Sequence, residues 1–94
     1  MLTVNAYFNN RVKSIGFQTQ TLPATVGVMM AGEYQFDTNQ KETMTVISGQ
    51  LAAQLPGSDR WQTFSQGESF LVEANQIFSL KVDIETAYLC TYQQ

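Results

Sequence analysis

The sequence predicts an all-β protein that folds as a small sandwich or barrel. Helical periodicity is almost absent over its 94 residues. Short stretches rich in β-branched and aromatic residues recur instead, and Gly, Pro, Asn or Asp closes each one. Hydrophobic residues make up 44% of the chain and charged residues 14%, which is typical of a folded domain. A chain of this length supports one core, so we expect a single domain over residues 1–94.

The predicted strands follow one another at short intervals. Residues 1–10 show no clear alternation, and we expect a short helical turn or an arm there. Strands are expected at 11–18, 25–31, 32–37, 43–48, 50–55, 60–64, 69–72, 77–83 and 86–92. Turn signals separate them, such as DTNQKE at 37–42 and PGSD at 56–59.

Strand phase predicts which side chains share a face, because alternate residues of a strand point to opposite sides. Glu42 shares its face with Met44 and is expected to point into the interior. Arg11 and Lys13 share a face with Ile15. Several strands carry apolar residues on both faces, as expected where a second sheet or a second subunit covers the outer one.

Composition and charge exclude several classes of partner. The chain has five Lys and Arg residues and a net charge of −3, so we expect no nucleic-acid binding, which needs a basic surface. No apolar run approaches the roughly 18 residues of a membrane span, and no leader opens the chain. The single cysteine, Cys90, fits a reducing compartment. We therefore expect a cytoplasmic protein without a membrane partner.

The spacing of Glu42 and Gly49, with six residues between them, matches the end of the first motif of cupin barrels. Gly67 stands where the second motif begins. The sequence thus resembles a cupin, which implies a single-domain double-stranded β-helix, or jelly-roll, barrel.

The three histidine positions of the cupin motifs carry other residues in this chain, namely Phe36, Thr38 and Phe78. Transition metals need imidazole, thiolate or carboxylate ligands, and two phenyl rings with one hydroxyl supply none of these. We therefore expect no bound metal.

Eight short segments spread over nearly the whole chain resemble the small pyrimidine/purine nucleoside phosphorylase family. They are VKSIGF (12–17), VGVM (26–29), GEY-x-F-x-T (32–38), MTVISG (44–49), LP (55–56), W (61), G-x-x-F (67–70) and YLC-x-Y (88–92). The resemblance implies a metal-free homodimer without a cofactor. It would cleave purine and pyrimidine nucleosides with inorganic phosphate, giving a free base and a pentose 1-phosphate with broad base specificity. One departure is Glu73-Ala74-Asn75, where relatives tend to have Pro-Gly.

Phosphorolysis needs a group that holds phosphate and an acceptor for the sugar hydroxyls. We predict that Arg11 and Lys13 bind phosphate, although a charged edge strand that discourages aggregation explains them equally well. We predict that Glu42 is catalytic, since an interior carboxylate is costly unless it has a partner. It would accept ribose hydroxyls or act as acid or base, the alternative being a cap on backbone amides of its loop.

The base needs a stacking surface, and interior aromatic residues offer one. The candidate substrate-binding residues are Tyr34, Phe36, Phe78 and Tyr88, together with Thr38 on the same face as Phe36. Each aromatic is by itself equally typical of a hydrophobic core. A non-catalytic cupin that binds a nucleoside-like or sugar-like ligand is therefore the alternative function, and a purely structural dimer leaves the inward carboxylate unexplained.

Overall fold

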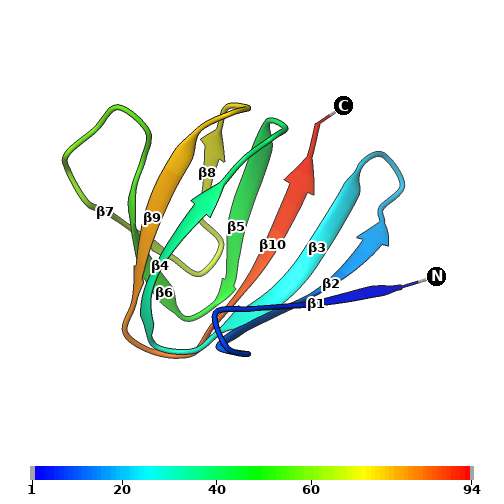
Figure 1. Ribbon diagram of the computed structural model, residues 1–94, viewed down its shortest axis with the longest axis horizontal. Coiled ribbons are helices and arrows are strands. Elements are labelled where there is room, and N and C mark those ends of the chain that lie inside the picture. The colour runs from blue at the N-terminus through cyan, green and yellow to red at the C-terminus, as the bar shows by residue number, and fades with distance from the viewer. Residues whose placement is uncertain (1, 94) are drawn as a thin grey trace.

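A computed structural model describes residues 2–93 as strands and turns, without a helix in that range (Figure 1). The strands are β1 (Thr3–Tyr7), β2 (Val12–Gln18), β3 (Pro23–Met29), β4 (Gly32–Asp37), β5 (Glu42–Ser48), β6 (Gln50–Gln54), β7 (Gln62–Ser65), β8 (Ser69–Val72), β9 (Ile77–Val82) and β10 (Thr86–Tyr92). The expected all-β class is confirmed. The predicted domain, 1–94, also includes Met1 and Gln94, which lie outside the described residues, and its extent stays a prediction. Within residues 2–93, no helix is long and apolar enough to cross a membrane.

Two antiparallel sheets face each other (Figure 1). The larger has the order β1-β2-β3-β10-β5-β8, and the smaller has the order β4-β9-β6-β7. The C-terminal strand β10 lies inside the larger sheet, where it pairs with β3 on one side and β5 on the other. Over the described residues, the pairing therefore gives two facing sheets rather than one closed barrel.

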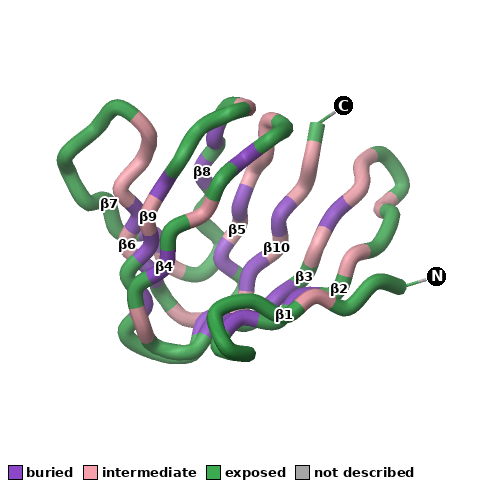
Figure 2. Tube along the Cα trace, viewed as in Figure 1, coloured by how far each residue is buried: buried purple, intermediate pink, exposed green. Residues whose placement is uncertain are grey.

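The hydrophobic core lies between the two sheets, and Figure 2 shows the buried residues on their facing strands. Phe78 and Leu80 of β9 pack there with Met29 of β3 and Leu51 of β6, all fully buried. Burying one such side chain contributes about 1.5–3 kcal/mol. The core occupies only part of the space between the sheets, because polar residues replace apolar ones along β2, β3, β5 and β10.

The N-terminal segment differs from the prediction. Residues 3–7 form strand β1, which pairs with β2 from Thr3 opposite Gly16 to Tyr7 opposite Val12. Phe8, Asn9 and Asn10 then have φ of 52°, 57° and 67°. This left-handed region suits asparagine and reverses the chain. The expected helical turn or arm is wrong, because β1 is an edge strand that its partner specifies rather than its own alternation.

Two other strands begin two residues away from their predicted starts. The strand predicted at 25–31 spans Pro23–Met29, and the one predicted at 60–64 spans Gln62–Ser65. Trp61 lies in the loop before β7, with the Lys81 ammonium 4.1 Å from its ring centroid. The aromatic residue that suggested a strand therefore makes a cation–π contact on the surface instead.

The solvent-facing side of the larger sheet is unusually apolar. Val4, Ile15 and Val26 lie side by side across β1, β2 and β3, and all three are exposed. We use "outer face" for this surface, whose exposed members include Val4, Ala6, Lys13, Ile15, Phe17, Val26, Val28, Ile47, Ser69 and Leu71. Lys13 is the one charged residue among them.

Candidate functional site

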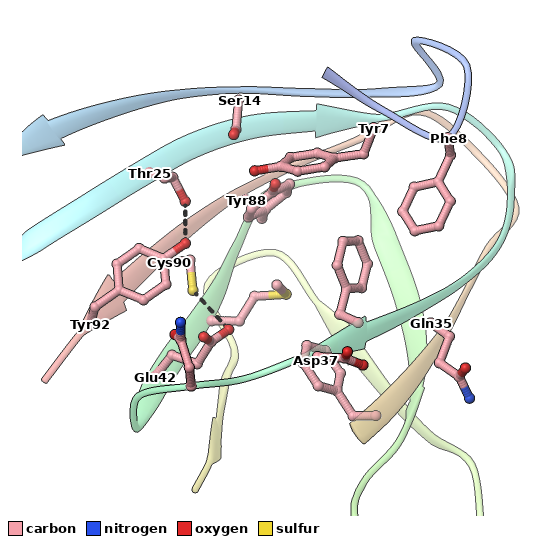
Figure 3. A pocket seen from close by; sticks show the side chains of 14 residues that line it. Tyr7, Phe8, Ser14, Thr25, Gln35, Asp37, Glu42, Tyr88, Cys90 and Tyr92 are labelled. Carbon is pink, nitrogen blue, oxygen red and sulfur yellow. Dashed lines mark hydrogen bonds between the residues drawn. The ribbon is translucent and has the colours of Figure 1, made fainter. Parts of the chain in front are cut away.

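A cavity of about 430 Å³ opens between the two sheets (Figure 3). This volume lies within the usual range for small-molecule sites. The lining combines aromatic rings, hydroxyls, side-chain amides and carboxylates from both sheets: Tyr7, Phe8, Ser14, Thr25, Gln35, Phe36, Asp37, Asn39, Glu42, Met44, Phe78, Tyr88, Cys90 and Tyr92. No lysine or arginine belongs to this lining, within the part of the chain that the structure describes.

Glu42 is the first residue of β5 and lines the cavity with Met44, as its strand phase predicts. The Cys90 thiol donates a hydrogen bond to its carboxylate, with 3.5 Å between Sγ and Oε1 (Figure 3). Burial raises the pKa of Glu42, and the thiol hydrogen bond opposes part of that rise. Within residues 2–93 the carboxylate accepts no backbone amide, so the cap interpretation finds no support.

Cys90 is the donor in this pair because it stays protonated. It is buried in the middle of β10, and burial raises the pKa of the thiol well above its ordinary value. The register of β10 and β5 brings the two together, since Cys90 lies opposite Met44 and Tyr92 lies opposite Glu42. A neutral thiol and a half-buried carboxyl therefore share one wall of the cavity.

Two tyrosines of β10 supply hydroxyls to the same wall. The Tyr92 hydroxyl lies 3.0 Å from Oγ1 of Thr25, within hydrogen-bond distance. Burial raises the pKa of Tyr88 to about 12, against a lowering contribution from hydrogen bonding with Ser14. In Figure 3, the side chains of Ser14, Tyr7 and Tyr88 gather at one end of the cavity. Because burial raises the pKa of both tyrosines of β10, the Tyr88 and Tyr92 hydroxyls stay protonated at neutral pH and are available as donors.

The predicted aromatic residues divide into two groups. Phe36, Phe78 and Tyr88 line the cavity. Phe78 is also a core residue, 2% exposed, with its ring centroid 5.7 Å from that of Phe36 in a stacked arrangement. Tyr34 does not line this cavity: its ring is buried, and its hydroxyl donates to the Met30 carbonyl at 2.6 Å.

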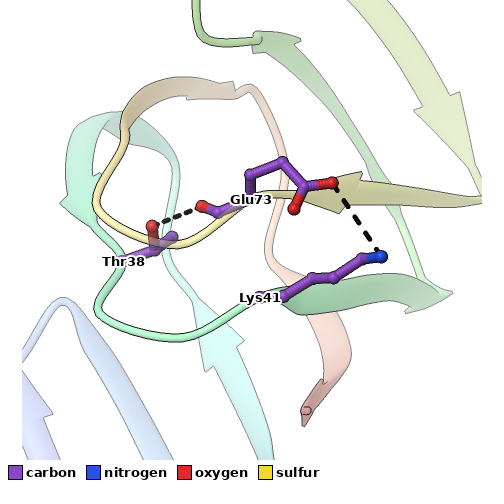
Figure 4. Close-up of polar contacts among 3 residues, drawn as sticks. All are labelled: Thr38, Lys41 and Glu73. Carbon is purple, nitrogen blue, oxygen red and sulfur yellow. Dashed lines mark hydrogen bonds and ion pairs between the residues drawn. The ribbon is translucent and has the colours of Figure 1, made fainter. Parts of the chain in front are cut away.

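Thr38 ties two loops together (Figure 4). Its hydroxyl donates to the Glu73 carbonyl at 2.7 Å and accepts the Gln76 amide at 3.0 Å. Lys41 and Glu73 form an exposed ion pair beside it, with Nζ and Oε2 3.9 Å apart. Thr38 is 6% exposed and does not belong to the cavity lining, so its hydroxyl serves the turn at 73–76.

The two predicted phosphate ligands lie away from the cavity. Arg11 donates to the Ala31 carbonyl at 2.7 Å, and its guanidinium carbon is 5.7 Å from the Tyr34 ring centroid. Lys13 is exposed on the outer face. Neither belongs to the cavity lining, so the structure does not bring them together with Glu42. Their phosphate-binding role stays a prediction.

Several cavity residues were missed in the sequence. Tyr7 and Phe8 come from β1 and the turn after it, which carried no strand signal. Ser14 was detectable, because its strand phase opposes that of Lys13 and so points inward. Thr25 and Asn39 gave no local signal, since only the pairing of β3 with β10 and the path of the 38–41 loop bring them to the cavity.

The donor set does not fit the metal site of a histidine-bearing cupin. At the three histidine positions, Phe36 and Phe78 stack on each other and the Thr38 hydroxyl bonds to backbone. Over residues 2–93, no three His, Cys, Asp or Glu side chains come together in a way that could hold a metal ion. The cavity is instead walled mainly by aromatic rings and neutral donors, with the carboxyl groups of Glu42 and Asp37.

Comparison with known proteins agrees with the family resemblance found in the sequence. A sequence model of the family described as pyrimidine/purine nucleoside phosphorylase matches residues 2–92. A protein of that name from Magnetococcus marinus is 66% identical over 92 residues, covering 98% of this chain and 99% of the relative.

Two solved structures are similar in fold. A protein of unknown function from Vibrio parahaemolyticus is 46% identical, with a TM-score of 0.95 over 99% of each chain. An RmlC-like cupin from Shewanella frigidimarina has a TM-score of 0.76 at 15% identity, over 97% of this chain and 82% of its own. The second similarity concerns the fold alone and confirms the cupin class.

Proposed function

The chain belongs to the pyrimidine/purine nucleoside phosphorylase family, and from this premise we propose that it cleaves purine and pyrimidine nucleosides by phosphorolysis. Inorganic phosphate would attack C1′ of the sugar, forming a C1′–O bond while the C1′–N bond to the base breaks. The products are a free base and a pentose 1-phosphate. The observation that carries the proposal is a half-buried carboxyl, Glu42, in a cavity lined mainly by aromatic rings and neutral donors, with Asp37 as the other carboxylate of the lining.

Glu42 acts on the sugar in this proposal. Its carboxylate accepts the ribose hydroxyls, and its negative charge stabilises the positive charge that develops on C1′ and the ring oxygen as the base departs. The Cys90 thiol supports this role, because a donor at 3.5 Å holds Oε1 in place and favours the charged form. The second carboxylate oxygen is left to face the substrate.

The base stacks on aromatic rings. Phe36 and Tyr92 are only partly buried in the cavity wall, so each has ring surface available to a ligand. Stacking accepts any base, because every base has a π face, and this accounts for broad base specificity. The Tyr92 hydroxyl and the Asn39 amide are the donors that can relieve the charge of the departing base.

Phosphate is held by neutral donors in this scheme. The cavity lining brings hydroxyls of Ser14, Tyr7 and Tyr88 together, and O–H groups bind phosphate oxygens through charge-assisted hydrogen bonds. The reaction as written needs no metal and no cofactor, with inorganic phosphate as co-substrate. The alternative site at Arg11 and Lys13 lies outside the cavity.

We also propose a homodimer formed through the outer face. Exposed Val4, Ile15, Val26 and Val28 form a continuous apolar surface across three neighbouring strands. Large apolar patches of this kind are typical of protein interfaces. A second copy of the chain is a suitable occupant, because the surface carries a single charge, from Lys13, and an isologous contact buries the same patch on both copies.

The test is to incubate chelator-treated protein with uridine or adenosine, with and without inorganic phosphate. Release of free base and pentose 1-phosphate that requires phosphate and survives chelation is the expected result. Activity that disappears on chelation and returns with added metal contradicts the metal-free scheme. Binding of nucleoside without turnover favours the alternative function, a non-catalytic cupin that binds a nucleoside-like or sugar-like ligand.

A further inference from the structure

Gly27 lies in the middle of β3, where glycine weakens a strand because it has no side chain to pack. It is buried and points to the cavity side of the sheet. In the pairing register it stands directly between Ser14 of β2 and Tyr88 of β10, both of which line the cavity. A glycine in this position often marks a close approach of another group to the backbone.

That group is the Tyr88 ring. A Cβ atom at position 27 would lie 2.6 Å from both Cζ and Oη of Tyr88, and 2.7 Å from Cε1. Contacts between carbon atoms normally lie at about 3.5–4.0 Å, so no side chain fits there with the ring in place. Gly16 of β2 provides a contrast, since the nearest atoms to a Cβ there lie 3.7 Å away, an ordinary contact.

The ring therefore leans across β3 instead of standing up from the sheet. Side chains of a strand normally stand roughly perpendicular to it. Tyr88 reaches over the bare backbone of Gly27 toward Ser14 and is only 5% exposed, although it lines the cavity. With any side chain at position 27, the ring would have to rise from the sheet into the space that a ligand occupies.

We infer that Gly27 determines base specificity: by letting Tyr88 lie flat, it keeps the cavity deep enough for a purine as well as a pyrimidine nucleoside. This inference rests on the proposed function. Gly27 acts through Tyr88 and touches no substrate, so it is a positioning residue. The one cavity must hold phosphate and nucleoside together, so a ring raised into it leaves less room for the nucleoside. The two-ring base is then excluded before the one-ring base.

The test is Gly27→Ala, assayed by phosphorolysis of adenosine and of uridine. The ratio of kcat/KM for adenosine to that for uridine should fall by about tenfold or more, the scale on which one extra methylene is discriminated in a tight pocket. The change should lie mainly in KM for adenosine. Tyr88→Ala also removes one of the proposed phosphate donors, so both nucleosides are assayed at saturating phosphate and that loss affects both alike. The ratio itself should move in the opposite direction, because the variant enlarges the same space.

The matched control is Gly16→Ala, on the same side of the sheet in the neighbouring strand, which should leave the ratio unchanged. Gly27→Ala should also have no further effect on the ratio in a Tyr88→Ala background. An unchanged ratio in Gly27→Ala overturns the inference, and so does an equal shift in the control or an additive effect in the double variant.

The same set of variants also serves as a control for loss of folding. If Gly27→Ala alone is insoluble, the double variant with Tyr88→Ala should be soluble, and equal insolubility of both overturns the inference. A wild-type protein that cleaves neither nucleoside overturns the proposed function and this inference with it. An active wild type whose Gly27→Ala variant keeps the wild-type ratio overturns this inference alone.

Discussion

Along part of the larger sheet, polar residues face the space between the sheets and apolar residues face solvent. In a monomeric protein we would expect the reverse. Four consecutive residues of β3 show this: Thr25 and Gly27 face the space between the sheets, while Val26 and Val28 face solvent. The next inward residue, Met29, is fully buried in the core. A single strand thus passes from a polar cavity wall to hydrophobic core within a few residues, with an apolar outer face throughout.

The difference is what we expect of a sheet with two occupants. Polar groups and a glycine on an inward face weaken the core, because they remove apolar surface that would otherwise be buried. Exposed valine and isoleucine on the other face favour association. The proposed nucleoside on the inside accounts for the polar inward face, and the proposed second copy on the outside accounts for the apolar outer face. Each of these two interactions can be removed separately.

Glu42→Gln tests the inner face, with the largest expected effect. The amide keeps the shape of the side chain but loses the charge that would stabilise the developing positive charge on the sugar. We expect kcat to fall by about 100-fold or more, the range for a group acting directly on the reacting centre. Steady-state kinetics with uridine and saturating phosphate measure it. The matched control is Glu33→Gln, an exposed glutamate on β4; equal rates in the two variants would place the chemistry elsewhere.

Ile15→Glu tests the outer face. A charge placed in the apolar row between Val4 and Val26 should dissociate the proposed dimer, because burying an unpaired carboxylate is strongly unfavourable. Sedimentation equilibrium of wild type and variant measures the change. Ile84→Glu is the control, since Ile84 is an exposed isoleucine outside this face. A monomeric wild-type protein would remove the explanation for the apolar outer face.

The pH dependence gives a smaller effect on the inner face. Burial raises the pKa of Glu42. As acid is added, activity that needs the carboxylate should therefore begin to fall at a higher pH than it would with an ordinary glutamate. The stability of the folded state depends on pH in the opposite direction. The folded state holds this proton more tightly than the unfolded state, so the contribution to unfolding free energy is present below the unfolded pKa and is lost as pH rises through the raised value.

Two measurements test these opposite pH dependences of activity and stability. The pH–rate profile of the wild type should show an acidic limb displaced upward from the ordinary glutamate value. Urea denaturation should show that Glu42→Gln gains stability relative to wild type when the pH is raised above the wild-type Glu42 pKa. A gain that is the same in acidic and alkaline buffer would mean that the carboxyl is not desolvated.

Lys13→Ala has the smallest expected effect and separates the two phosphate hypotheses. Lys13 is exposed on the outer face and lies outside the cavity lining, so the cavity scheme predicts unchanged KM for phosphate. Phosphate titrations at fixed uridine measure it, and Arg11→Ala serves as a parallel variant. A clear rise in KM for phosphate in either variant would restore the assignment made from the sequence.

The sequence determined the all-β class, the inward phase of Glu42, and the faces of Tyr88 and Cys90, because alternation along one strand is a local property. It also carried the family resemblance, in short segments spread along the chain. Alternation placed Lys13 on the same face as Ile15 and opposite Ser14, but only the structure shows that this face is the outer one.

Only the tertiary structure decided which of these inward residues meet. Cys90 reaches Glu42, 48 positions away in the chain, because β10 pairs with β5. Gly27 receives the Tyr88 ring because β10 also pairs with β3. Strand order inside a sheet depends on long-range contacts, which no periodicity within a single strand records. The cavity therefore had identifiable parts in the sequence, and the insertion of the last strand between β3 and β5 assembled them.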